Sequence, residues 1–180
     1  MTQTTPDDHA PGTLEQLADG RWRLRFTRVL AHPPERVWRA ISEPEELAAW
    51  FPSSIDGDRE PGAPLRFTFP GEIAPPMDGV MVAYEPPTLM ELQWGPDAIR
   101  IELEPHAEGT LLTLLDTLEA QGKAARDGAG WHVCLDSLRA HLAGRPAAHE
   151  ETVAWREVHP HYLESFGPEA ATIGPPEGFE

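Results

Sequence analysis

Five strand-like segments follow one another between residues 65 and 118, and only short turns separate them. The clearest segment, residues 99–105, places Ile99 and Ile101 on one face and charged side chains on the other. This period of two is typical of a half-buried strand, and short turns between consecutive strands favour antiparallel pairing. A sixth alternating segment, residues 21–29, comes earlier in the chain. The sequence therefore predicts an antiparallel sheet.

The individual strands differ in how they should lie in that sheet. The five segments are residues 65–69, 78–84, 89–94, 99–105 and 110–118. The last is apolar on both faces, as expected of a central or helix-covered strand. Pro64 precedes the first segment and has no N–H to donate, so this strand should begin late or lie at a sheet edge.

Three stretches of the chain have helical rather than strand periodicity. Residues 121–143 repeat apolar side chains at helical spacing, which predicts one long helix able to span a small sheet and cover one face. Residues 33–51 predict two short helices, with Ser42 and Glu45 spaced as a capping box for the second. Near residue 160, a proline interrupts a further helical pattern, which predicts a kinked or two-piece helix.

Charge and cysteine content exclude several classes of function. The 180 residues carry a formal net charge of −16, which opposes binding to nucleic acid or to an anionic membrane surface. Cys134 is the one cysteine, so neither an internal disulfide nor a multi-cysteine metal site can form. Because the sequence has no long apolar run and no signal-like segment, we expect a cytoplasmic protein without membrane insertion. The chain has no asparagine and one lysine but is rich in Arg, Ala, Pro and Gly, which indicates a GC-rich bacterial coding sequence.

An ordered set of motifs between residues 22 and 143 resembles the START-like (SRPBCC, helix-grip) superfamily. Within it, the chain is most similar to the branch related to the C-terminal domain of the activator of Hsp90 ATPase. The motifs are Pro34-x-x-Val37-Trp38-x-Ala40-Ile41-Ser42-x-Pro44-x-x-Leu47-x-x-Trp50-Phe51, Gly79-Val80, Glu85-Pro86-Pro87-x-Leu89, Trp94, Glu104-Pro105, Gly109-Thr110-x-Leu112 and Gly130-Trp131-x-x-x-Leu135-x-x-Leu138. The resemblance implies an α+β helix-grip fold, in which a curved antiparallel sheet wraps around a long C-terminal helix.

The resemblance also implies a cavity between the sheet and the long helix, closed at one end by the two short helices. The residues expected to face it are Trp50, Phe51, Phe67, Phe69, Met90, Trp94, Ile101, Leu114, Asp116, Trp131, Cys134, Leu135 and Leu138. The alternative is that these side chains simply pack together, since protein interiors are close-packed. Asp116 is either a ligand-facing group or general base, or a strand-end residue that reaches solvent.

Two other candidate sites fail on spacing. Cys134 and His141 are seven residues apart, about 10 Å along a helix, which is too far for a nucleophilic pair. His159 and His161 could chelate a metal only in an extended segment, and no third ligand is evident. We therefore expect no metal, no cofactor and no catalytic residue.

Three functions remain, and the first is binding of a hydrophobic or amphipathic small molecule in the cavity. A co-chaperone-like interaction module ranks second, and a cyclase or hydratase type of enzyme ranks third.

A C-terminal aromatic stripe should dock on the protein itself, or else form a homodimer contact, through Trp155, Val158, Tyr162 and Phe166. The expected organisation is a flexible leader (1–13), a helix-grip domain (14–144) and a C-terminal extension (145–180).

Overall fold

The computed structural model describes residues 9–147 and 151–175. Within these residues, seven strands form a single antiparallel sheet in the order β1-β2-β7-β6-β5-β4-β3. The strands are β1 Thr13–Gln16, β2 Trp22–Leu30, β3 Pro64–Phe67, β4 Met77–Glu85, β5 Leu89–Trp94, β6 Asp97–His106 and β7 Gly109–Leu118. The α-helices are α1 Pro34–Ser42, α2 Pro44–Leu47, α3 Ala124–Leu142 and α4 Glu151–Phe166. Short 3-10 helices are η1 Pro70–Glu72, η2 Gln121–Lys123 and η3 Pro168–Ala171.

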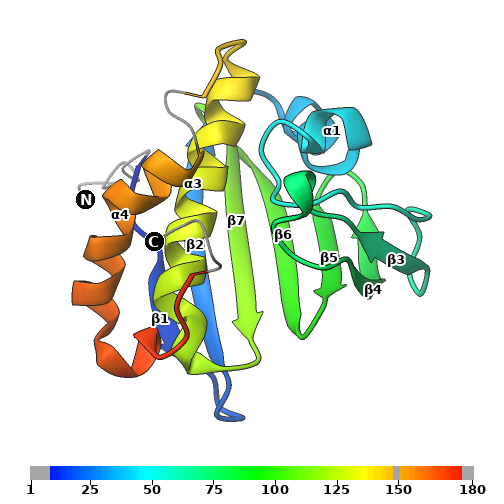
Figure 1. Ribbon diagram of the computed structural model, residues 1–180. Helices are drawn as coiled ribbons and strands as arrows, with labels where there is room; N and C mark the ends of the chain where they lie inside the picture. The colour runs from blue at the N-terminus through cyan, green and yellow to red at the C-terminus, as the bar shows by residue number, and fades with distance from the viewer. Residues whose placement is uncertain (1–8, 148–150, 176–180) are drawn as a thin grey trace.

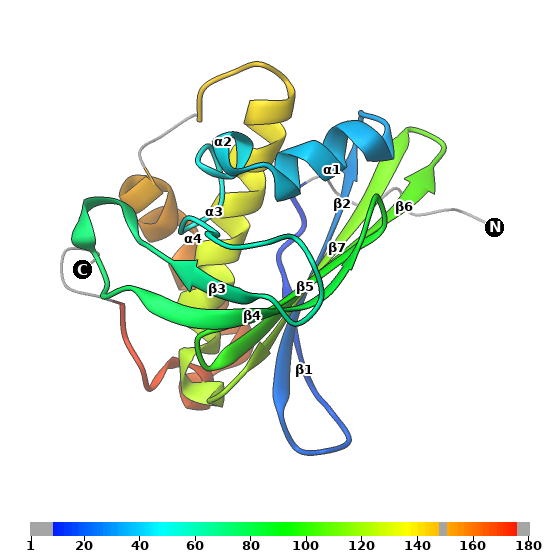
Figure 2. The ribbon, with the colours of Figure 1, turned by 90° about the vertical axis from the view of Figure 1, so that its right-hand side faces the viewer.

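The helices lie on one face of the twisted sheet (Figures 1 and 2). Helix α3 crosses that face, α4 packs beside α3, and α1 and α2 close the upper end in the view of Figure 1. This confirms the predicted α+β helix-grip fold, with its curved sheet, long C-terminal helix and two short helices after an early strand.

All six predicted strands are present, and β1 is an additional strand that the sequence pattern did not reveal. Thr13 of β1 pairs with Arg25 of β2, so a short, mostly polar segment forms one sheet edge. Strand β7 lies between β2 and β6, which confirms its predicted central position. Strand β3 begins at Pro64 and forms the other edge, in agreement with the missing N–H donor of that proline.

Helix α3 covers the sheet with Trp131, Leu135 and Leu138, all of which are buried. After α3 the chain turns at Gly144, whose φ of 70° lies in the left-handed region that favours glycine. The predicted period and end of this helix are therefore confirmed. None of the described residues belongs to a helix that is long and apolar enough to cross a membrane.

The two short helices begin as their prolines predict, but the predicted capping box is wrong. Pro34 occupies the first turn of α1 and Pro44 the first turn of α2. Ser42 instead belongs to α1, where its hydroxyl donates to the carbonyl of Trp38 at 2.6 Å. Its hydrogen-bonding capacity is therefore used within α1, and Glu43 occupies the N-cap position of α2 without a side-chain cap.

Helix α4 runs through Pro160 as one helix, so the predicted alternative of two separate pieces is wrong. Pro160 removes one backbone donor, but the buried side chains of Trp155 and Tyr162 on either side anchor the helix. The Tyr162 hydroxyl accepts a hydrogen bond from the Gly12 N–H at 2.9 Å and lies 2.8 Å from Nδ1 of His132. The segment just before β1 is thereby tied to α3 and α4, whereas residues 1–8 of the expected leader lie outside the described residues.

Candidate functional site

Aromatic rings fill the middle of the space between the sheet and α3. Phe51, which follows α2, lies 5.5 Å from Trp131 of α3 and 6.2 Å from Trp94 of β5, measured between ring centroids. Trp94 and Trp131 are themselves 5.7 Å apart. We call α1, α2 and the segment up to Phe51 the lid; Trp50 fixes its end by donating an indole N–H to the carbonyl of Ala40 at 2.8 Å. The aromatic side chains after the short helices therefore fill the interior beneath the lid.

A pocket of about 330 Å³ opens beside these rings, between the start of β6 and the first half of α3. We call it the sheet–helix pocket. Its aromatic wall consists of Phe69, Trp94, Trp131 and Trp155. Its charged end consists of Asp97, Lys123, Arg126 and Asp127. Ligand pockets typically combine apolar walls with a few convergent polar groups, and this pocket has both features.

Backbone geometry brings the two parts of the pocket together. Trp94 ends β5 and pairs directly with Asp97 at the start of β6, across a tight turn in which Gly95 has a φ of 58°. Asp127 and Trp131 are four residues apart on α3 and therefore lie on the same face of that helix. The turn and the helix thus each supply one aromatic and one acidic side chain to the pocket.

Each cation of the charged end is held by a neighbouring carboxylate. The Lys123 ammonium lies 2.6 Å from Oδ1 of Asp97, and the two side chains are only 8% and 4% exposed. The same carboxylate oxygen accepts the Glu119 backbone N–H at 2.8 Å. Nε of Arg126 donates to Oδ1 of Asp127 at 2.6 Å. The Lys123–Asp97 pair is buried, and such a pair forms only where the partners compensate each other's desolvation, whereas the Arg126–Asp127 pair is only partly buried.

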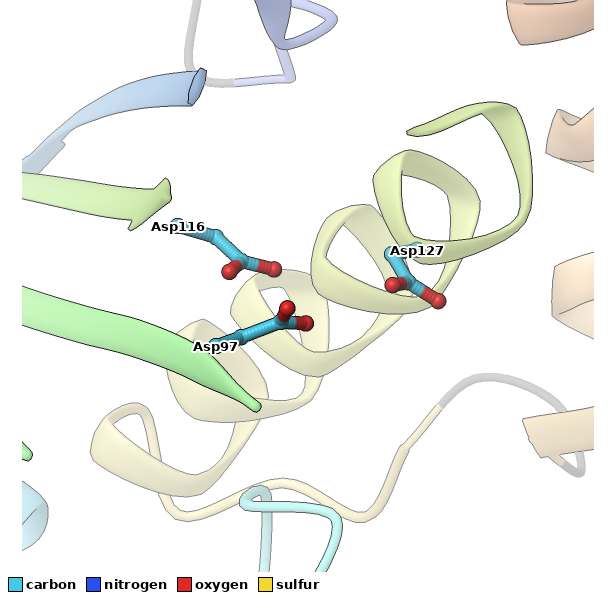
Figure 3. A group of neighbouring side chains, drawn as sticks. All are labelled: Asp97, Asp116 and Asp127. Carbon is cyan, nitrogen blue, oxygen red and sulfur yellow. The ribbon is translucent and has the colours of Figure 1, made fainter. Parts of the chain in front are cut away.

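A third carboxylate, Asp116 of β7, lies behind the charged end and is completely buried. Its Oδ2 accepts the indole N–H of Trp131 at 2.8 Å, whereas its Oδ1 has no hydrogen-bond partner among the described residues. Figure 3 shows how Asp97, Asp116 and Asp127 converge from β6, β7 and α3. One carboxylate oxygen from each lies within 4.8 Å of the other two. Carboxylates at this spacing could hold a metal ion, but Lys123 and Arg126 already neutralise two of them.

Burial and repulsion favour the neutral form of this third carboxylate. Burial raises the pKa of Asp116 well above its usual range, and the negative charges of Asp97 and Asp127 raise it further. The hydrogen bond from Trp131 and the charge of Lys123 act in the opposite direction but are smaller effects. Burial also raises the pKa of Asp127, against the influence of Arg126. Asp116 therefore keeps its proton to a higher pH than an ordinary aspartate does.

This raised pKa predicts a pH-dependent difference between the wild type and Asp116→Asn. The folded wild type binds more protons than its unfolded chain, so Asp116 costs stability as the pH rises through the folded pKa. Asparagine cannot ionise, yet its Oδ1 can still accept the Trp131 N–H. Between about pH 4 and pH 8, we expect the unfolding free energy of the wild type to fall relative to that of the variant.

Urea unfolding at a series of pH values measures this difference. Asp78→Asn is the matched control, because the Asp78 side chain is 80% exposed on β4. Its profile should run parallel to that of the wild type at every pH. A parallel profile for Asp116→Asn as well would show that Asp116 has an ordinary pKa in the folded protein.

The predicted cavity residues divide into three groups. Those that line the sheet–helix pocket are Phe69, Trp94, Trp131 and Cys134. A separate hollow of about 310 Å³ under the lid is lined in part by Trp50, Phe51 and Cys134. The remainder are buried and line neither hollow: Phe67, Met90, Ile101, Leu114, Asp116, Leu135 and Leu138. Asp116 does not reach solvent, and it contacts the pocket through Trp131 rather than lining it.

Sequence reasoning missed the whole charged end of the pocket and Trp155 of its wall. Asp127 carried a usable signal, because it precedes Trp131 by four residues and so lies on the same face of α3 as that buried side chain. Asp97 follows a turn, where a carboxylate is usually exposed, and Lys123 belongs to a residue type that is rarely buried. No local pattern could have identified these two residues.

The candidate sites rejected from the sequence are occupied by structural contacts. Nε2 of His141 lies 3.0 Å from a carboxylate oxygen of Glu46 and links α3 to the lid. The His159 ring stacks on Trp155 with centroids 4.1 Å apart. Because His159 and His161 lie on helix α4, they are not in the extended segment that chelation would require.

The twisted sheet, the long helix and the pocket between them define a protein of the START-like, helix-grip class. More specifically, the chain belongs to the Activator of Hsp90 ATPase homolog 1-like protein family, whose model matches residues 31–143. A comparison with curated protein sequences finds no significant match.

Several solved structures share this fold at low sequence identity. CalU16 from Micromonospora echinospora is 22% identical, with 86% of this chain and 95% of that chain covered and a TM-score of 0.68. A conserved protein of unknown function from Enterococcus faecalis is 21% identical, with coverages of 85% and 88% and a TM-score of 0.69. A protein from Bordetella parapertussis is 24% identical, with coverages of 89% and 95% and a TM-score of 0.66. At these identities the similarity establishes the fold alone.

Proposed function

We propose that this protein binds a small amphipathic molecule in the sheet–helix pocket. The observation that carries this proposal is a pocket of about 330 Å³ with aromatic rings along its wall and paired charged groups at one end. Its volume lies at the lower end of the range for small-molecule sites, which is about 300–1,000 Å³. The apolar part of the ligand would lie against the aromatic wall, and its polar part would face the charged end.

The rigidity of the pocket supports binding without a large rearrangement. Trp131 is fixed by its hydrogen bond to Asp116, and Trp155 donates its indole N–H to the carbonyl of Arg126 at 3.2 Å. Side chains that are already ordered lose little conformational entropy when a ligand binds. The first role of Asp116 in this proposal is therefore to position an aromatic wall residue.

The two alternative functions have less support from the site. An enzyme of the cyclase or hydratase kind needs an acid or base within reach of its substrate, and Asp116 lies behind Trp131 instead. A co-chaperone-like interaction stays a prediction that rests on the family name. The homodimer contact also stays a prediction, although Trp155 and Tyr162 already bury most of their surface within their own chain.

Native mass spectrometry and titration with decanol test the proposal. Freshly purified protein should release a small non-covalent adduct on collisional activation, or else it should bind added decanol. Decanol binding should change the tryptophan fluorescence, because Trp94, Trp131 and Trp155 border the pocket. Saturation at one molecule per chain is the expected result. Adduct-free protein that shows no saturable response to decanol or to its amine and carboxylate analogues would contradict the proposal.

A further inference from the structure

The charged end of the sheet–helix pocket has an excess of acidic groups. Asp97 and Asp127 line it together with Lys123 and Arg126, and Asp116 lies directly behind them. The three carboxylates outnumber the two cations, and each cation is already paired at 2.6 Å. An anionic ligand group would have to compete with these carboxylates for Lys123 or Arg126. A cationic group would instead supply a counter-charge for Asp116, the one carboxylate of the three that has no cation paired with it.

The third carboxylate points into this cluster without a partner of its own. Asp116 is completely buried, and its Oδ1 accepts no hydrogen bond among the described residues. Figure 3 shows its carboxylate directed toward those of Asp97 and Asp127. A buried oxygen that lacks a partner is unfavourable, so a donor or a positive charge brought near it is stabilised.

The aromatic wall favours the same kind of ligand. The faces of tryptophan and phenylalanine rings attract cations, and the attraction is strongest where water is excluded. In this pocket, rings and carboxylates border one volume, since Trp94 and Asp97 are paired across the β5–β6 turn. An ammonium group could therefore contact ring faces and carboxylates at the same time.

We propose that the ligand of the sheet–helix pocket is an amphipathic amine, whose ammonium group binds the carboxylates of the charged end while its apolar part lies on the aromatic wall. This inference rests on the proposed function. It adds the chemical class of the ligand, because an ammonium group donates hydrogen bonds through its N–H groups and carries the counter-charge that an ionised Asp116 lacks.

Binding should also displace a proton. Asp97, Asp127, Lys123 and Arg126 are the charged groups that face Asp116, and burial and the two acidic neighbours raise its pKa. A bound ammonium adds positive charge beside this cluster and favours the ionised form of Asp116. Calorimetric titration in buffers of different ionisation enthalpy should therefore show proton release on amine binding, and no proton release on binding of an uncharged analogue.

The test uses decylamine, decanol and decanoate, which share one chain and differ in the head group. Each is titrated near neutral pH, below its critical micelle concentration. Decylamine should bind about ten-fold tighter than decanol, and decanoate should bind weakest. Asp116→Asn should remove most of the affinity advantage of decylamine over decanol, since asparagine cannot ionise. Asp78→Asn, at an exposed position on β4, should change neither.

The other outcomes overturn the inference in distinguishable ways. Failure of all three compounds to bind would reject the proposed function and this inference together. Equal affinity for the three head groups would retain the binding function and reject the amine. Tightest binding of decanoate would show that Lys123 or Arg126 selects the head group. Stabilisation by Ca²⁺, Mg²⁺ or Mn²⁺ that Asp116→Asn abolishes, with no preference for the amine, would show that the carboxylates hold a metal ion.

Discussion

Lys123→Met should lower the free energy of unfolding by about 3–5 kcal/mol, because removing one partner of a buried ion pair leaves the other charge uncompensated. The charge left behind is that of Asp97, whose side chain is only 4% exposed. Methionine has a similar length and can occupy the space of the lysine stem, so the loss of the charge dominates the effect. Chemical denaturation at neutral pH measures the change.

Two control variants separate the ion pair from other causes. Arg66→Met breaks the pair with Asp78, whose side chains are 53% and 80% exposed, and it should cost less than about 1 kcal/mol. Asp97→Asn combined with Lys123→Met should recover most of the lost stability, since asparagine is uncharged and can still accept the Glu119 N–H. A cost for Lys123→Met as small as that of Arg66→Met would show that the pair is solvated and exchangeable.

Gly130→Leu should reduce decanol affinity by about ten-fold or more without destabilising the protein. Gly130 lies on α3 and lines the sheet–helix pocket, and a Cβ atom at this position would have no atom within 4 Å outside its own helix and chain neighbours. A leucine side chain would therefore grow into the pocket rather than into the core. Leucine also favours a helix over glycine by up to about 1 kcal/mol, so the melting temperature should stay the same or rise.

Gly130→Ala is the matched control for this variant. It gains the same kind of helix stabilisation but fills little of the pocket, so its decanol affinity should resemble that of the wild type. The two variants are compared by fluorescence titration and thermal unfolding. Equal affinities for Gly130→Leu and Gly130→Ala would place the bound decanol elsewhere, for example in the hollow under the lid that Trp50 and Phe51 line.

Period and turn chemistry were enough to predict most of the fold. The alternation in residues 99–105 reappears as buried Ile99, Ile101 and Leu103 on β6, since half-buried strands need apolar side chains at every second position. The edge position of β3 also agrees with the sequence, because Pro64 has no N–H to donate to a neighbouring strand. The exceptions have physical causes. Strand β1 is polar and short, so its pairing with β2 leaves no local pattern.

The candidate site was predicted only where the core and the pocket share side chains. Trp94, Trp131, Phe69 and Cys134 were expected to face inward because of their apolar character, and they line the sheet–helix pocket. The charged end was missed because polar residues at a strand start or a helix start usually face water. The burial of these charged residues depends on side chains that are distant in the sequence, so it cannot be predicted from a single segment of the chain.

Local periodicity and backbone chemistry in the sequence were therefore enough to predict six of the seven strands, the long helix and their order along the chain. Only the tertiary structure decided how the carboxylates meet. Ile99 of β6 pairs with Asp116 of β7, which places Asp97, two residues earlier on the same face, beside Asp116. Docking of α3 onto that face then adds Asp127 and Trp131. Sheet register and helix packing thus bring acidic residues that are distant in the sequence into one cluster, since electrostatic coupling depends on distance in space.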